Sequence, residues 1–526
     1  MPWQYRVQWV LIAWLASLLP AAIAQASPLQ PDGSTATQVQ GHQIVPVGAG
    51  TVRGNNLYHS FDRFNVNPEG AVFGTGTSSV NGAQIQNILN RVTGSDPSVI
   101  LGTLQSRQAF PNANLWLMNP NGLVFGAGAR LEVGGSFFGT TATGIGFANG
   151  DIFQAVKDAS FSASTPQSLH FGVATPAPLV NEGHLQAQGV YLSGGTVLST
   201  GQVTGEQVSV LAAPGGSQVE LRSPDAVLGL AVQAGAVPTN WQGRIAELPE
   251  LAQQLTGPGS PLATPGTAVV AGNVEGQRVG VFGERVAVTG DIRAPQGTVH
   301  LGGNVSGSGP APNAAQTLVT GQIDVSAGDT GNGGEVVIWG DRTAQFSGRI
   351  AARGGTTGGD GGLVEVSSPD YLDFQGEVDT RAPQGQTGTL LLDPTDIRVV
   401  LNPPAAGNLT NVANFANPNT DGPESRILSG LINAATSNVE LQATNDIIFD
   451  ASVAIAAAGI SLTAGPGATS RSINRSPPPT ATLPCRPTIR GHRRSPPVGL
   501  LLSHPFLPAA GISRPRAERS WKSTRP

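Results

Sequence analysis

The chain has 526 residues, of which 70 are glycine and only 12% are charged, and its formal net charge is −5. So much glycine and so few charges exclude a bundle of surface-exposed helices, because each glycine costs a helix about 1 kcal/mol relative to alanine. The single cysteine, Cys485, excludes an internal disulfide framework, and the acidic balance disfavours nucleic acid as a partner, because phosphates would repel it.

Residues 1–26 are predicted to be a secretory signal peptide. Arg6 supplies the basic start, and Trp9 to Leu19 is apolar apart from one serine. Small residues at Ala22 and Ala24, or at Ala24 and Ala26, follow in the spacing of a cleavage site. The apolar stretch is shorter than the roughly 20 residues that a transmembrane helix needs. We therefore expect no transmembrane helix in the mature chain, although an uncleaved anchor stays an alternative.

From Gln25 to about Gly465, short apolar runs alternate with glycine, asparagine, aspartate, serine and threonine. The runs have the two-residue period of strands, and the residues between them favour tight turns. Pairs 28 residues apart repeat near the end of this region: Gly334 and Gly362, Phe346 and Phe374, Gly348 and Gly376. A period of this length predicts an all-β solenoid whose units bury their apolar sides on their neighbours.

Three segments of the first 145 residues go beyond composition: NLYHSFDRFNV (56–66), IQNILNRVTGSDPSVILG (85–102) and NLWLMNPNGLVFGAGARLEVGGSFFGTTA (114–142). In order and spacing they resemble the secretion domain, also called the haemagglutination activity domain, of filamentous-haemagglutinin-like exoproteins. The resemblance implies a two-partner secretion domain over residues 27–170 and a β-helical repeat region over residues 171–468.

By resemblance, the fold is a right-handed parallel β-helix that caps the stack at its N-terminal end. An outer-membrane β-barrel partner transporter would recognise the domain, and the chain would cross unfolded and fold outside. The resemblance implies a secreted adhesin or structural protein at the surface of a Gram-negative bacterium, which binds an unknown carbohydrate or protein ligand without catalysis.

The residues that carry this resemblance are the candidate site. Asn119, Pro120, Asn121 and Gly122 form a strong turn signal, and they could be purely structural or could be recognised by the transporter. The other family-matching positions are His59, Phe61, Phe64, Asn65, Gly134, Gly135, Ser136 and Phe137. We expect His59 to be a packed or surface histidine rather than a metal ligand.

No motif for catalysis, a metal or a cofactor is apparent. The chain lacks an intact phosphate-binding loop, HExxH, CxxC and G-x-S-x-G. Asp329 and Asp360 lie in glycine-rich turns, but their spacing does not fit the nine-residue calcium repeat, so we expect each carboxylate to bond its own turn. We therefore expect no enzyme. The alternatives are a β-helical polysaccharide-acting enzyme and a truncated contact-dependent toxin carrier.

Residues 469–526 differ abruptly from the rest. After Ser470 there are eleven prolines, ten arginines and one lysine but only one acidic residue. Proline cannot continue a ladder of strands, because it lacks the backbone N–H donor. We expect a disordered basic tail, possibly translated in a shifted frame, and a nucleic-acid-binding or surface-binding arm is a further alternative.

Overall fold

The computed structural model describes residues 29–47, 51–76, 79–221, 266–401 and 424–465. The expected signal peptide and the expected basic tail, including Cys485, lie outside these residues. Within the described ranges, no helix is both long and apolar enough to cross a membrane.

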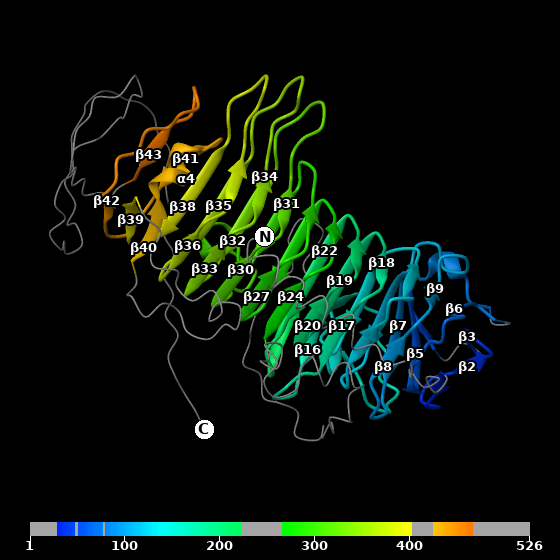
Figure 1. Ribbon diagram of the computed structural model, residues 1–526. Helices are drawn as coiled ribbons and strands as arrows, with labels where there is room; N and C mark the ends of the chain where they lie inside the picture. The colour runs from blue at the N-terminus through cyan, green and yellow to red at the C-terminus, as the bar shows by residue number, and fades with distance from the viewer. Residues whose placement is uncertain (1–28, 48–50, 77–78, 222–265, 402–423, 466–526) are drawn as a thin grey trace, which may run out of the picture. The chain divides into compact units, whose positions relative to one another are not determined.

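Three sheets of mostly parallel strands make up the coils (Figure 1). We call them sheets A, B and C. Sheet A has the order β1 (Gln30–Pro31), β5 (Asn56–Arg63), β7 (Asn87–Val92), β10 (Asn114–Met118), β13 (Phe137–Thr140), β19 (Gly189–Gly194), β22 (Gln207–Ala212), β26 (Arg278–Phe282), β29 (Thr298–Leu301), β32 (Glu335–Trp339), β35 (Leu363–Ser368), β38 (Thr389–Pro394), β41 (Asn438–Leu441) and β43 (Leu462–Ala464), with β4 (Val52–Arg53) beside β5.

Sheet B has the order β2 (Thr37–Gln40), β3 (Gln43–Pro46), β6 (Ala71–Phe73), β9 (Thr103–Gln105), β12 (Arg130–Glu132), β18 (His184–Gln186), β21 (Gln202–Thr204), β25 (Val274–Glu275), β28 (Ile292–Arg293), β31 (Gln322–Asp324), β34 (Arg349–Ala351) and β37 (Glu377–Asp379). Sheet C runs, in chain order, through β8 (Ser98–Ile100), β11 (Leu123–Phe125), β17 (Pro178–Asn181), β20 (Thr196–Ser199), β24 (Thr267–Val270), β27 (Arg285–Val288), β30 (Gln316–Val319), β33 (Thr343–Phe346) and β36 (Leu372–Phe374). Most coils add one strand to each sheet, although sheet C contains only β8 to β36 and sheet B ends at β37. The predicted parallel β-helix is confirmed.

The core is a set of apolar columns inside the coils. On sheet A one column contains, in register, Leu57, Ile88, Leu115, Phe137, Val190, Val208, Val279, Val299, Val336, Val364, Leu390 and Val439. All of these side chains are buried. Burying one such side chain stabilises the fold by about 1.5–3 kcal/mol. A coil obtains this burial only from the coils above and below it.

Coil length varies because loops and hairpins are inserted at the corners. Val190 and its partner Val208 are 18 residues apart in sequence. The predicted 28-residue period separates Val336 from Val364, and the rings of Phe346 and Phe374 lie 5.7 Å apart. The predicted repeat is therefore confirmed for these coils, but it does not extend to the whole chain.

The longest described insertion forms a second layer. An antiparallel sheet has the order β15 (Ile152–Gln154), β14 (Gly144–Phe147), β16 (Pro166–Phe171) and β23 (Ser217–Glu220). Its apolar side chains, such as Ile145 and Phe153, form a second buried cluster with Tyr58, Leu89 and Trp116. The layer thus covers the outward face of the first strands of sheet A. The predicted boundary between the secretion domain and the repeat region, at residue 170, lies within β16.

The remaining elements are short. The parallel strands β39 (Ile397–Val400), β40 (Ser425–Leu428) and β42 (Ile447–Phe449) form a small sheet late in the chain. The helical turns are η1 (Gly82–Gln84), η3 (Val305–Gly307) and α4 (Ser429–Asn433).

The glycine-rich turns around Asp329 and Asp360 stack on one another. Thr330 pairs with Gly358, Asn332 Oδ1 accepts a hydrogen bond from the Asp360 N–H (2.8 Å), and Asp360 Oδ1 accepts one from the Gln386 N–H (2.8 Å). From the sequence we expected the Asp360 carboxylate to bond its own turn, but it accepts its hydrogen bond from the neighbouring loop instead. Among the described residues, no group of three or more histidine, cysteine, aspartate or glutamate side chains could hold a metal ion.

We predict that Phe346→Ala lowers the free energy of unfolding by about 3–5 kcal/mol, the cost of a cavity at a buried aromatic residue. Phe346 is 1% exposed. Leu401→Ala is the control, because Leu401 is 74% exposed and its truncation should change stability by less than about 0.5 kcal/mol. Chemical denaturation measures the stability of both variants. Equal effects would contradict the burial of Phe346 in the core.

Candidate functional site

The Asn119–Gly122 tetrad is a tight turn between β10 and β11. The Gly122 N–H donates to the Asn119 carbonyl oxygen (3.1 Å), and Gly122 has a φ of 124°, in the region that favours glycine. All four residues of the tetrad are buried. The turn predicted from this sequence is present, and in the folded chain it is not a surface feature.

The side chains of the tetrad tie this turn to the preceding coil. The Asn119 amide donates to the Asp96 carbonyl (2.9 Å) and to Ser98 Oγ (3.0 Å), and its oxygen accepts from the Asn121 N–H (2.9 Å). The Asn121 amide donates to the Gly94 carbonyl (2.7 Å). Because these groups are buried, each bond satisfies a polar atom that water cannot reach. The geometry gives the tetrad a structural role.

Three asparagines, at the first positions of β5, β7 and β10, form a ladder of side-chain hydrogen bonds. The Asn87 amide donates to Asn56 Oδ1 (2.9 Å), the Asn114 amide donates to Asn87 Oδ1 (3.2 Å), and Asn114 Oδ1 accepts from the Ser136 N–H (2.9 Å). The ladder fixes the register of these coils, and it ends at one of the family-matching positions. Sequence reasoning missed it, although an asparagine stands before each apolar run in NLYHS, NILNR and NLWLM.

Gly134 and Gly135 form a corner that has no room for a side chain. A Cβ on Gly134 would lie 2.4 Å from the carbonyl oxygens of Phe110 and Pro111, and one on Gly135 would lie 2.6 Å from Asn114 Oδ1. Phe137 follows inside the core, edge-on to Phe125 at 5.7 Å. These glycines let the corner approach the preceding coil closely.

Three further matching positions also hold the first coils together. Phe61 and Phe64 are buried and meet edge to face, with ring centroids 4.9 Å apart. Asn65 Oδ1 accepts a hydrogen bond from the Val99 N–H of the next coil (2.8 Å). All three side chains therefore contribute to packing or pairing.

His59 points into the interior and is fully buried. Its Nδ1 lies 2.8 Å from Thr37 Oγ1 in the N-terminal strand β2, whereas its Nε2 has no partner among the described residues. Burial lowers the pKa of His59 to about 3, because a charged ring would have no water around it. The ring thus fits the packed histidine that the sequence led us to expect.

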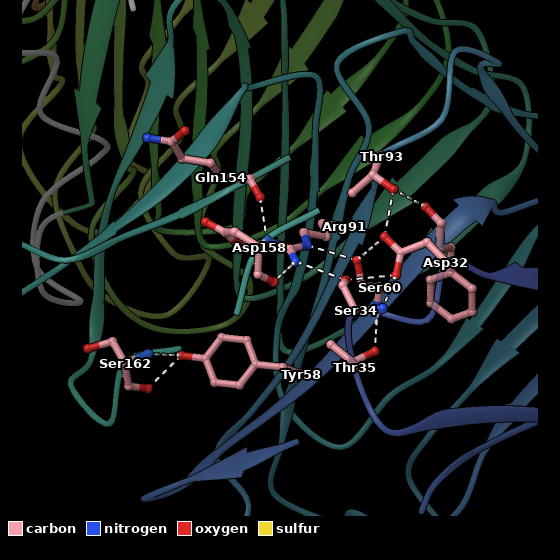
Figure 2. A network of polar contacts seen from close by, with 11 residues as sticks. Asp32, Ser34, Thr35, Tyr58, Ser60, Arg91, Thr93, Gln154, Asp158 and Ser162 are labelled. Carbon is pink, nitrogen blue, oxygen red and sulfur yellow. Dashed lines mark hydrogen bonds and ion pairs between the residues drawn. The ribbon is translucent and has the colours of Figure 1, made fainter. Parts of the chain in front are cut away.

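Arg91, which sequence reasoning also missed, is the centre of a buried polar network (Figure 2). Its side chain is 0% exposed and lies on the outward side of β7, under the second layer. Its guanidinium group donates five hydrogen bonds, to Ser60 Oγ, Ser34 Oγ, the Gln154 carbonyl, and the carboxylate and carbonyl of Asp158. The signal in the sequence was a lone arginine in the apolar run NILNRV.

Asp32 joins the same network from the N-terminal segment. Its carboxylate accepts hydrogen bonds from Ser60 Oγ (2.7 Å), Thr93 Oγ1 (2.6 Å) and both the N–H and the hydroxyl of Ser34 (2.8 and 2.7 Å). Burial alone would raise the pKa of Asp32, but the hydrogen bonds from Thr93, Ser34 and Ser60 outweigh it and hold this pKa below its usual value.

We predict that Asn119→Ala combined with Asn121→Ala lowers the free energy of unfolding by about 2–4 kcal/mol, because it leaves buried carbonyl groups without donors. Asn112→Ala is the matched control, since Asn112 is exposed in a nearby loop and should change stability by less than about 0.5 kcal/mol. Unchanged thermal and chemical stability of the double variant would show that the tetrad does not hold the coils together.

We predict that His59 makes folding weaker in acid. In the unfolded chain His59 binds a proton below about pH 6.5, whereas in the folded chain it stays neutral down to a pKa of about 3. Unfolding therefore takes up a proton, and the free energy of unfolding falls as the pH decreases between these values. In denaturation curves His59→Gln should lose less stability between these values than the parent does. Parallel curves would contradict the prediction.

Comparisons with known proteins agree with the resemblance read from the sequence. Residues 24–246 match the family model of the TPS secretion domain, a stretch that contains all three resembling segments. Among solved structures, the chain is similar to the HMW1 secretion domain from Haemophilus influenzae, with 14% identity and a TM-score of 0.43 over 85% of this chain and 96% of that chain. It is also similar to a filamentous hemagglutinin secretion domain, with 14% identity and a TM-score of 0.29 over 70% and 100%.

A search of curated proteins gives no match. The family match covers the coils whose turn, asparagine ladder and buried arginine are described above. The N-terminal part of this chain, residues 24–246, therefore matches the TPS secretion domain, which indicates an exoprotein of the two-partner secretion type.

Proposed function

We propose that this protein is an adhesin at the cell surface of a Gram-negative bacterium, and that it attaches to a carbohydrate or protein ligand without catalysis. A signal peptide over residues 1–26 would direct it to the periplasm, and an outer-membrane β-barrel partner would carry it across. The secretion domain from residue 27 to 170 would start the fold, and the coils of residues 171–468 would extend it. Residues 469–526 would be a separate tail.

The observation that carries this proposal is the polar outward face of sheet B. Gln186, Thr204, Glu275, Arg293 and Asp324 stand in register on five successive strands, and all except Thr204, whose hydroxyl is buried, are exposed. The alternate side chains, such as Leu185 and Val203, are buried. Neighbouring strands lie about 4.8 Å apart, so the face presents hydrogen-bonding groups at a fixed repeat. Such an array suits a ligand that carries many hydroxyl or amide groups, because weak contacts add up along it.

A pocket of about 410 Å³ lies at the start of this face, lined by Arg107, Leu131, Glu132, Gly134, Gln186, Ala187 and Gln188. Arg107 Nε donates to the Val133 carbonyl (3.0 Å), which orients the guanidinium group. The side-chain amides of Gln186 and Gln188 make no hydrogen bond within the described residues. Amide, guanidinium and carboxylate groups together can bind neighbouring hydroxyls or a peptide group.

We further propose that the partner transporter meets Asn119, Pro120, Asn121 and Gly122 in the unfolded chain. Their burial supports this order of events, because the finished turn leaves them inaccessible to another protein. The transporter would then recognise these residues first, and the same residues would stabilise the turn after folding.

The test is to express the full chain, with and without its partner transporter, in a Gram-negative host that does not attach to cultured epithelial cells. We expect protein outside the cells, and attachment, only when both genes are present. Gln186→Ala combined with Gln188→Ala should lower attachment and leave secretion unchanged. The control is Gln218→Ala, which alters a partly exposed glutamine on β23 outside sheet B.

Periodate treatment of the epithelial surface should abolish attachment if the ligand is a carbohydrate, and protease treatment should do so if it is a protein. Full secretion without attachment would show that the protein is not an adhesin. Intracellular retention in the presence of the transporter would contradict the proposed partner.

A further inference from the structure

We propose that residues 303–313 form a strap on the outer face of sheet A, which is closed at low pH and opens as the pH rises. The strap contains η3 and belongs to the corner that leads from β29 in sheet A to β30 in sheet C. In the coils on either side, this corner takes two residues (283–284) and three residues (340–342), whereas here it takes fourteen (302–315). The extra chain turns back over sheet A instead of continuing the coil.

The base of the strap is closed by bonds that do not involve the strap itself. The Gly302 N–H donates to the Val281 carbonyl oxygen (2.9 Å), and the Ala314 N–H donates to the Gly302 carbonyl oxygen (2.6 Å). Gly302 has a φ of 78°, which lets the chain leave the strand sharply. Because these bonds hold both ends in the coils, residues 303–313 can move without breaking the ladders of sheets A and C.

Within the described part of the chain, two side chains from later coils form hydrogen bonds to the strap. Both carboxylate oxygens of Glu365, on β35, accept from the Ser306 N–H (3.0 and 3.1 Å). Asp341 Oδ1 accepts from the Asn313 amide (3.0 Å). The strap is therefore attached at two points, and Glu365 holds its middle.

Trp339 on β32 packs beneath the strap between these two points. A side chain on Gly307 would collide with the indole ring, and a Cβ on Gly303 would lie 2.9 Å from Trp339 Cγ. The indole Nε1 donates to Asp341 Oδ1 (2.7 Å), which fixes the ring under the strap. Opening of the strap would uncover this ring and the Glu365 carboxylate.

Three features make the closed strap costly. Ser306 has a φ of 52°, a left-handed conformation that residues other than glycine rarely adopt. The Asn304 side-chain nitrogen is buried and has no hydrogen-bond partner among the described residues. The Glu365 side chain is fully buried, so closure removes a carboxylate from water. The closed form is thus one that a change in charge at Glu365 can release.

The titratable groups that face Glu365 belong to neighbouring strands of sheet A. Glu335 on β32 accepts from or donates to no strap residue, and its Oε1 lies 2.9 Å from His300 Nε2 on β29. Asp393 lies on β38, and Glu440 on β41 faces it. Residues 303–313 contain no charged side chain, so the charge at this contact changes only when groups of sheet A titrate.

Burial is the main reason why the pKa of Glu365 is raised above its ordinary value, and the charges of Asp393 and Glu335 raise it further. The hydrogen bond from Ser306 acts in the opposite direction but does not outweigh burial. A proton therefore binds more tightly to the closed form than to an open form in which water reaches the carboxylate. Closure is favoured most below the ordinary glutamate pKa, and it weakens as the pH rises through the raised value.

The test is hydrogen exchange of the folded full chain from about pH 4 to about pH 8, expressed as protection factors that correct for the effect of pH on exchange itself. The amides of Ser306, Gly307 and Ser308 should lose protection as the pH rises. The expected loss is about tenfold for each unit by which closure raises the pKa of Glu365. Amides of β32 and β35 should stay protected throughout, which separates opening of the strap from unfolding of the coils.

Glu365→Gln keeps the shape of the side chain and a carbonyl oxygen for the Ser306 N–H but cannot ionise, so its strap should stay protected at every pH. Glu365→Ala removes the acceptor, and its strap should exchange about tenfold faster even at low pH. Glu377→Gln is the matched control, since Glu377 is exposed on β37 in sheet B, and it should behave like the parent.

Strap protection that does not change with pH in the parent would overturn the proposal. A Glu365→Gln variant that keeps the pH dependence of the parent would do the same, because another group would then be responsible. Protection in Glu365→Ala equal to that of the parent would show that this carboxylate does not hold the strap.

Discussion

Register between neighbouring coils is the constraint on which the rest of this structure depends. Every coil buries its inward apolar side chains against the coils next to it, and parallel strands alternate inward and outward positions. A slip of one residue in β29 would exchange the inward Val299 for the outward His300. Such a slip would turn a whole column of side chains to the wrong face. The low charge content and the frequent glycines of the chain follow from this requirement.

The first two coils depart from the rule of apolar inward and exposed outward residues. His59 and Asn90 stand in register inside the stack, and Arg91 is buried on its outer side. His59 bonds Thr37 of the N-terminal strand β2, Asn90 donates to the Trp116 carbonyl of the next coil, and Arg91 bonds the inserted segment. Departures from the general pattern are expected where function is added to a fold. In the first coils they lie where the stack begins and has no earlier coil to guide its register, and Glu365 on β35 is a further buried charged residue.

The sequence predicted those features that depend on local patterns. Phe346 and Phe374 repeat at coil length, which a fixed period in the sequence shows, and Asn119 to Gly122 are four consecutive residues that favour a turn. It did not predict that β14 leaves the coils. The segment GIGF has the same short apolar pattern as a coil strand, and its antiparallel partner β16 is identified only by tertiary packing. The partners of Arg91 were hidden for the same reason, because Asp158 is 67 residues away.

The unequal coil lengths have a mechanical consequence. Backbone hydrogen bonds between strands connect one coil to the next, so a load along the stack can detach a terminal coil without disturbing coils farther inside. Each detached coil then releases its own length of chain. The 18 residues from Val190 to Val208 and the 28 from Val336 to Val364 correspond to about 60 and about 95 Å when fully extended. A stretched molecule would lengthen in unequal steps, and each step would dissipate work while the remaining coils stay folded.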